Sequence, residues 1–138
     1  MSIEAFVLNY RDGDVFPLSF DKVRAVFDTP GTAWNADHNC LNVRFTDPDD
    51  YVDIFFGCDA ALIGTVKGLT IARPIRHADF LKRMFQLLQL DNVMMFYSDE
   101  TAPIFYPTSD PTQYPGDLLD ALGTPRYAES PDDLVHQT

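Results

Sequence analysis

The sequence predicts an α+β domain with an antiparallel or mixed sheet of about five strands, on which one long amphipathic helix and one or two shorter helices pack. Runs of alternating apolar and polar residues, separated by turns rich in Asp, Gly and Pro, indicate the strands. Apolar residues at helical spacing indicate the helices. With 138 residues, the chain has a length at which one domain buries roughly two thirds of its unfolded surface. Residues 1–138 are therefore expected to form a single domain.

The first third of the chain is expected to fold into a strand, a turn and a helix. Residues 3–10 alternate between two faces, as strand residues do, and apolar side chains occur on both. An Asp-Gly pair follows, and this pair tolerates the positive φ of a tight turn. Ser19 is the expected N-cap of a helix over residues 20–27. Residues 28–39 are predicted to be a loop.

An antiparallel meander is expected in the middle of the chain. Residues 40–45 and 51–56 are two strand-like runs joined by a short loop that contains Asp and Pro, which is a hairpin signal. Residues 65–72 form a third run. Gly68 interrupts this run, and a glycine inside a strand usually marks a bulge or a close approach of the backbone.

The clearest helix of the sequence is predicted over residues 77–90, where one stripe is apolar and the opposite side is polar. The apolar run over residues 93–97 is expected to be a central strand. Beyond Ser98, prolines recur at four-residue intervals, which argues against a regular helix or a central strand there. A short helix is expected over residues 116–122, and Ser130 is a candidate N-cap for a last helical turn.

The net charge excludes some classes of partner. A formal charge of -11 argues against nucleic acid and against an anionic membrane surface, because both bind clustered Lys and Arg. The charge is concentrated late in the chain, since residues 91–138 hold nine acidic side chains and one basic side chain, Arg126. A basic protein partner is therefore expected, although acidic surfaces also arise because they confer solubility.

Cysteine usage and the start of the chain predict a cytoplasmic protein. Only Cys40 and Cys58 are present, and two cysteines in a reducing compartment are expected to stay reduced. The first residues carry Glu4 early and lack the basic start and unbroken apolar stretch of a signal peptide. No apolar run approaches the roughly 20 residues that a membrane-spanning helix needs.

Sequence motifs give no support for an enzyme. The glycines match neither GxGxxG nor GxxxxGK[ST], so no nucleotide cofactor is predicted. A GxSxG motif is also lacking, which argues against a serine hydrolase. The sequence therefore predicts a non-enzymatic protein that holds no cofactor.

One cluster keeps a small enzyme, or a ligand- or metal-binding domain, open as an alternative. Asp37, His38 and Cys40 stand close in sequence, and Cys58 follows at the end of the next strand. Thiolate, imidazole and carboxylate groups are zinc ligands, but this spacing matches no standard zinc pattern, and no metal is predicted. Cys40 with His38 or His77 would also be a candidate nucleophile and base. The commoner explanation is a polar loop that leads into a strand with a buried cysteine.

The leading hypothesis is a partner-binding surface, formed mainly by the last third of the chain. Tyr and Trp are favoured contact residues because each joins a rigid apolar body to a polar tip. Acidic residues around them would steer a basic protein toward the surface. The alternative is that the rings cover the core and the acids only solubilise the loop. The predicted partner-binding residues are Trp34, Tyr97, Asp99, Glu100, Tyr106, Asp110, Tyr114, Asp117 and Asp120.

Taken whole, the chain resembles a group of small uncharacterised bacterial proteins that are acidic and α+β. The resemblance rests on the segments IEAFVLNYRDGD, GLTIARP, FLKRMFQLL and DLLDALGTP. This type of protein includes immunity proteins, which neutralise toxins of interbacterial competition. The resemblance implies a non-enzymatic protein that blocks a basic site on a toxin. A third interpretation is a structural homo-oligomer that pairs through an exposed strand edge.

Overall fold

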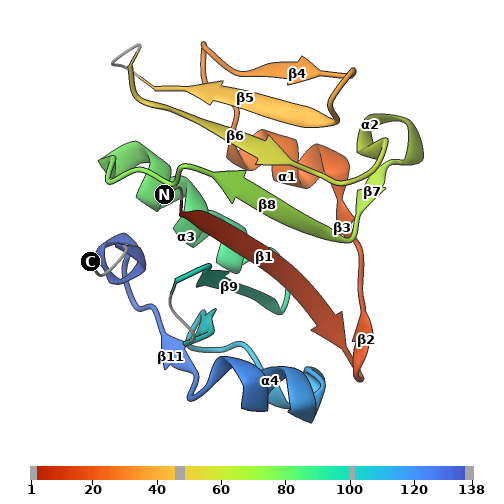
Figure 1. Cartoon of the computed structure of the whole chain (residues 1–138), viewed down its shortest axis with the longest axis vertical. Coiled ribbons are helices and arrows are strands. Elements are labelled where there is room, and N and C mark those ends of the chain that lie inside the picture. The colour runs from red at the N-terminus through yellow and green to blue at the C-terminus, as the bar shows by residue number, and fades with distance from the viewer. Residues whose placement is uncertain (1–2, 46–48, 100–101, 136–138) are drawn as a thin grey trace.

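The computed structural model describes residues 3–45, 49–99 and 102–135 (Figure 1). Nine strands form one mixed sheet, and two further strands pair in a small second sheet. The strands are β1 (Glu4–Arg11), β2 (Asp14–Val15), β3 (Leu18–Ser19), β4 (Ala33–Asn35), β5 (Cys40–Arg44), β6 (Tyr51–Phe55), β7 (Thr65–Val66), β8 (Gly68–Ala72), β9 (Val93–Tyr97), β10 (Ile104–Phe105) and β11 (Arg126–Tyr127). The helices are α1 (Phe20–Val26), α2 (Ala60–Ile63), α3 (Ala78–Leu88) and α4 (Gly116–Leu122), with the 3-10 turns η1 (Pro111–Gln113) and η2 (Pro131–Leu134).

Strand β1 lies at the centre of the large sheet. It pairs antiparallel with β8 on one side and with β9 on the other. The sheet continues from β8 through β6 and β5 to β4, and from β9 through β10 to β11. All of these neighbours are antiparallel except β10 and β11. The predicted hairpin of β5 and β6 and the antiparallel meander that continues to β8 are therefore confirmed.

The predicted sheet of about five strands under a long amphipathic helix is wrong, because the large sheet has nine strands. The α-helices in the described part of the chain are also short, with 11 residues in α3. The strands missing from the prediction contain two or three residues each, too few to show an alternating pattern. They form because other strands supply their hydrogen bonds: β2 pairs with the adjacent β1 and β4 with the adjacent β5, whereas β3 pairs with the distant β7. Strand β10, for example, lies in the proline-rich segment and pairs with both β9 and β11.

Several local predictions are confirmed. The Ser19 hydroxyl accepts a hydrogen bond at 3.3 Å from a backbone amide of α1 and caps that helix. Asp12 and Gly13 both have positive φ, of 52° and 82°, in the turn between β1 and β2. A Cβ atom at Gly68 would lie 3.2 Å from the Val7 carbonyl oxygen, so this glycine permits the close approach of β1 and β8.

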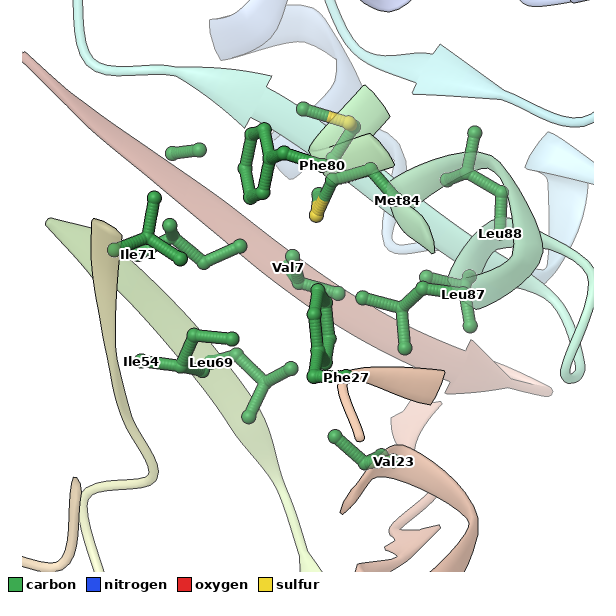
Figure 2. Packing of buried hydrophobic residues seen from close by; sticks show 14 of the residues in the cluster. Val7, Val23, Phe27, Ile54, Leu69, Ile71, Phe80, Met84, Leu87 and Leu88 are labelled. Atoms are coloured by element: carbon green, nitrogen blue, oxygen red, sulfur yellow. The ribbon is translucent and has the colours of Figure 1, made fainter. Parts of the chain in front are cut away.

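The main hydrophobic core lies between one face of the large sheet and the helices α1 and α3, which are behind the sheet in Figure 1. Its side chains come from strands and helices that are far apart in sequence (Figure 2). Burial of this apolar surface is the largest favourable contribution to folding, at about 25 cal/mol per Å². The buried residues labelled in Figure 2 are Val7, Val23, Phe27, Ile54, Leu69, Ile71, Phe80, Met84, Leu87 and Leu88.

A smaller core lies on the opposite face of the sheet, where α4 packs over β9 and β10. The Tyr114 hydroxyl is placed to donate to the Asn92 carbonyl oxygen at 2.6 Å and to the Leu8 carbonyl oxygen at 3.0 Å. These hydrogen bonds join the segment before α4 to β1 and to the start of β9. The apolar residues of this smaller core include Met94, Phe105, Tyr114, Leu118, Leu119 and Leu122.

Candidate binding surface

The rest of this second face is the candidate site. Side chains of β1, β8, β6 and β5 that point away from the main core stand in two neighbouring rows, because paired residues lie side by side. In the described part of the chain, α1 and α3 lie on the other face (Figure 1), and the smaller core under α4 reaches Leu8, Tyr10 and Phe96. No described helix covers the side chains of these rows that lie beyond that core. We call this surface the open face; it comprises Glu4, Phe6, Cys40, Asn42, Asp53, Phe55, Thr70 and Ala72, with Phe96 at its border with the smaller core.

Aromatic rings form the apolar part of the open face. The Phe55 side chain is exposed, with 38 % of the residue accessible to solvent. The rings of Phe6 and Phe96 lie side by side, with 5.2 Å between their centroids, and both residues are partly exposed. Thr70 on β8 stands between Phe6 and Phe55 in the same row. Apolar surface that water still reaches gains about 25 cal/mol per Å² when a partner covers it.

The polar end of the open face lies over β5 and β6, where a hollow of about 510 Å³ is partly lined by Arg44, Tyr51 and Asp53. The guanidinium groups of Arg44 and Arg73 lie 5.5 and 4.3 Å from the Tyr51 ring centroid. The Asp53 carboxylate accepts a hydrogen bond from the Asn42 side chain at 2.7 Å and lies 3.9 Å from the Arg73 guanidinium. The hydrogen-bonding and charged groups at this end are therefore paired with one another and do not point together at a ligand.

Cys40 lines a neighbouring hollow of about 360 Å³ but is not an activated nucleophile. Burial, together with the Asp53 carboxylate, raises the pKa of the Cys40 thiol to about 11. At neutral pH this group is a neutral thiol, whereas the thiolate is the nucleophile and the metal ligand. The geometry therefore disfavours a cysteine nucleophile at this position.

The other members of the predicted cluster lie in different surroundings. His38 is exposed and lines the same hollow as Cys40. Cys58 packs instead against the main core. His77 caps α3, where its Nδ1 accepts a hydrogen bond from a backbone amide at 3.2 Å. Within the described residues, no group of three His, Cys, Asp or Glu side chains is placed to hold a metal ion.

The predicted ring residues serve mainly to hold the fold together. Tyr97 is 2 % exposed, and its hydroxyl donates to a backbone carbonyl of η2 at 2.5 Å. Tyr114 is 4 % exposed. Trp34 packs edge-on against two phenylalanine rings of the main core, and the Tyr106 ring lies 5.6 Å from a phenylalanine ring of α3. The structure does not gather these four rings into one exposed surface.

The predicted acidic residues are solvent-exposed in every case that the structure describes. Asp99, Asp110, Asp117 and Asp120 are exposed, and Glu100 lies outside the described residues. The Asp110 carboxylate also has a local role, because it accepts hydrogen bonds from the hydroxyl and the backbone amide of η1 residue Thr112. These bonds lower the pKa of Asp110.

The tip of the β1–β2 hairpin brings further carboxylates beside α4 (Figure 1). The Gly13 amide donates to the Gln113 carbonyl oxygen at 2.8 Å, and the Asp12 amide donates to the Gln113 side-chain oxygen at 2.7 Å. Because of these contacts, acids from both ends of the chain lie at one end of the sheet. We call this group the acidic corner; it comprises Asp12, Asp14, Asp110, Asp117 and Asp120.

Sequence reasoning missed the aromatic residues of the open face. Phe6, Phe55 and Phe96 lie in strands that were predicted, and residues 3–10 and 93–97 carry apolar side chains on both faces. That pattern was a usable signal for a second apolar face. The pattern does not show which part of that second face is covered by a helix.

Comparison of the chain with known protein families, with curated proteins and with solved structures gave no match. None of the helices in residues 3–45, 49–99 and 102–135 has the length and apolar character needed to cross a membrane. The open face and the acidic corner are thus the features from which a function follows.

Proposed function

We propose that this protein is a non-enzymatic protein-binding domain that docks a basic partner on the open face. The observation that carries this proposal is the exposed Phe55 ring, which no described helix covers, together with the partly exposed rings of Phe6 and Phe96 on the same face. Aromatic side chains that stay accessible on a sheet face are typical of an interaction site.

The charge distribution supports a basic partner. The chain carries a formal charge of -11, and the acidic corner lies beside α4, at one end of the same sheet. A field of this sign speeds the encounter with a positively charged surface, while burial of the aromatic rings slows dissociation. The two features therefore act on different steps of one binding event.

A role as an immunity protein agrees with this arrangement. Such a protein needs no catalytic group, and it acts by covering a basic site on a toxin. We place this role in the cytoplasm, where the free thiols of Cys40 and Cys58 would stay reduced. The homo-oligomer considered from the sequence stays a prediction, which sedimentation at several protein concentrations checks.

Capture of the partner by matched variants tests the proposal. Tagged protein is incubated with lysate of the native cells, and bound proteins are identified after chemical cross-linking. Phe55→Glu places a charge in the open face, whereas Leu62→Glu places the same charge on α2, at a residue that is 82 % exposed and outside the open face. Thermal unfolding of both variants shows that each is folded.

We expect the wild-type protein and Leu62→Glu to capture the same basic protein and Phe55→Glu to lose it. Capture should also weaken at high salt, because screening reduces the attraction between opposite charges. Equal capture by both variants would show that the open face is not the binding surface.

A further inference from the structure

Exposed apolar side chains occur together at the edge of the molecule that carries β2, β3, β7 and α2, on the right of Figure 1. Leu62 and Ile63 on α2 are 82 % and 62 % exposed. Val15 and Phe16, at the end of β2, are 41 % and 40 % exposed. These four are most of the exposed large apolar residues in the described part of the chain. A group of this kind marks an interaction site, whereas a single exposed residue needs no explanation.

A hollow of about 360 Å³ lies beside α2 at this edge. Gly64, which ends α2, and Phe16, which follows β2, both line it. A helix that projects two apolar side chains and a partly apolar hollow are thus neighbours on one surface. The apolar residues that line the hollow are Phe16, Pro17, Leu18 and Leu90.

Hydrogen bonds hold the walls of this hollow in place. The Arg11 guanidinium donates to the Asp91 carboxylate at 2.8 Å and lies 3.9 Å from the Phe16 ring centroid. The buried Asn9 amide donates to the same carboxylate and to the Phe16 carbonyl oxygen, both at 3.1 Å. Strand β1, the β2–β3 connection and the turn after α3 are therefore joined around the hollow. A preformed site of this kind loses little conformational freedom when an occupant enters.

Unpaired charges of opposite sign lie on the two parts of this surface. Lys22 lines the hollow, and Asp59 immediately precedes α2. Both are exposed, and neither side chain has a polar partner among the described residues. The projecting part is thus acidic and the hollow carries a free ammonium, so the two parts are complementary in charge. Exposed residues of both signs surround them, namely Arg11, Asp14, Asp21, Lys22, Asp59 and Lys67.

We infer that this edge is a self-association surface, on which α2 of one copy packs into the hollow of a second copy. In a two-fold dimer every contact occurs twice, so a projection and a hollow side by side on one surface can each meet the other in the partner copy. Leu62 and Ile63 then cover the Phe16 side of the hollow, and Asp59 faces Lys22 of the other copy. The occupant is a second copy because each part matches the other in shape and charge.

This surface is separate from the one in the proposed function. It leaves the open face and Phe55 free, so self-association and capture of a basic protein do not exclude each other. It also differs from the strand-edge pairing considered from the sequence, because side chains of α2 and the hollow form the contact instead of backbone hydrogen bonds. The contact is small, and a formal charge of -11 on each copy opposes it, so we expect a dissociation constant of about 10 µM to 1 mM.

Sedimentation velocity of the full chain, from about 10 µM to about 1 mM, tests the inference with two matched variants. Leu62→Glu places a charge in the proposed contact, whereas Phe55→Glu places the same charge outside it. We expect the wild-type protein and Phe55→Glu to form dimers as the concentration rises, and Leu62→Glu to bind itself at least about tenfold more weakly, because the contact would bury its carboxylate. A wild-type protein that stays monomeric throughout this range, or equal association of Leu62→Glu, would overturn the inference.

A charge exchange tests the arrangement of the two copies. Lys22→Asp and Asp59→Lys should each weaken the dimer several-fold, because each creates two pairs of like charges in it. The double variant has the net charge of the wild-type protein and should recover most of the lost affinity. If the double variant associates no more tightly than either single variant, Asp59 does not face Lys22 and the two-fold arrangement is wrong.

The same two glutamate variants keep this inference distinct from the proposed function. Leu62→Glu should be monomeric and still capture the basic partner, while Phe55→Glu should form dimers and lose that partner. If Leu62→Glu forms dimers normally but Phe55→Glu fails to capture the partner, only the self-association surface is wrong.

Discussion

The two ends of the second sheet face carry similar side chains in different surroundings. Over β9 and β10, Phe105 is fully buried beneath the segment that contains α4. Over β6, Phe55 is 38 % exposed on the same face of the same sheet. The apolar side chains of a strand therefore do not decide whether a helix of the same chain packs over them. One end is covered by a helix of this chain, and the other has no described helix over it.

The largest expected effect is the loss of the covered ring. Phe105→Ala should lower the free energy of unfolding by about 3–5 kcal/mol, because it removes a buried ring and leaves a cavity under α4. Urea denaturation measures the change. A loss below about 1 kcal/mol would mean that α4 packs loosely, and the contrast between the two ends would then disappear.

The next effect concerns the thiol beside Phe55. In a Cys58→Ser variant, only Cys40 can react with iodoacetamide, and its pKa of about 11 keeps it protonated at neutral pH. We expect native Cys40 to react about two orders of magnitude more slowly than the same thiol in the unfolded chain. Mass spectrometry of timed samples gives both rates. Similar rates would show that this part of the open face is more accessible than the structure indicates.

A smaller effect is expected at the hydroxyl that holds the covered end together. Tyr114→Phe leaves the carbonyl oxygens of Leu8 and Asn92 without this donor and should lower the free energy of unfolding by about 1–3 kcal/mol. Tyr127→Phe is the control, because Tyr127 is 46 % exposed at the edge of the same face. Its free energy of unfolding should change by less than about 0.5 kcal/mol. Equal losses in the two variants would contradict the role of these hydrogen bonds.

The same tyrosine predicts a dependence on alkaline pH. Burial raises the pKa of Tyr114 above its ordinary value, so the phenol stays neutral in the folded protein after it ionises in the unfolded chain. The stabilisation from Tyr114 is therefore complete below pH about 10 and is lost as the pH rises above that value. Chemical denaturation between pH 9 and about 11 should show a steeper loss for the wild-type protein than for Tyr114→Phe.

The smallest effect is expected at the uncovered ring. Phe55→Ala should lower the free energy of unfolding by at most about 1 kcal/mol, because the residue is already 38 % exposed. The same urea titration that measures Phe105→Ala provides the value. A loss above about 2 kcal/mol would show that Phe55 is part of the packing, which would remove the basis for an open face.

Much of the local structure could be predicted from the sequence. The Ser19 cap, the Asp12-Gly13 turn and the helix Gly116–Leu122 agree with the structure, since each depends on residues within one or two turns of chain. The two-residue strands β10 and β11 could not be predicted, because two residues show no alternation and their hydrogen bonds come from other elements: β10 pairs with β9, and β11 pairs with β10 across α4. Propensity within such a short segment is too weak to outweigh those contacts.

The candidate site was less predictable than the fold elements. Residue type favoured Tyr97 and Tyr114 as contact residues, yet both rings are buried. Phe55 is exposed and Phe6 is partly exposed instead, although neither has a polar group. Whether a ring faces solvent depends on what lies on each side of its strand. That information is absent from the neighbouring residues.

The acidic charge, the alternation of the longer strands and the positions of several turns and caps can be read from the sequence alone. These properties come from composition or from contacts between residues that are close in the chain. Which sheet face is open, and which acidic side chains form the acidic corner, depend on the tertiary structure. The contact between Asp12 and Gln113 spans most of the chain. Such contacts depend on how whole elements pack, and local patterns carry little information about them.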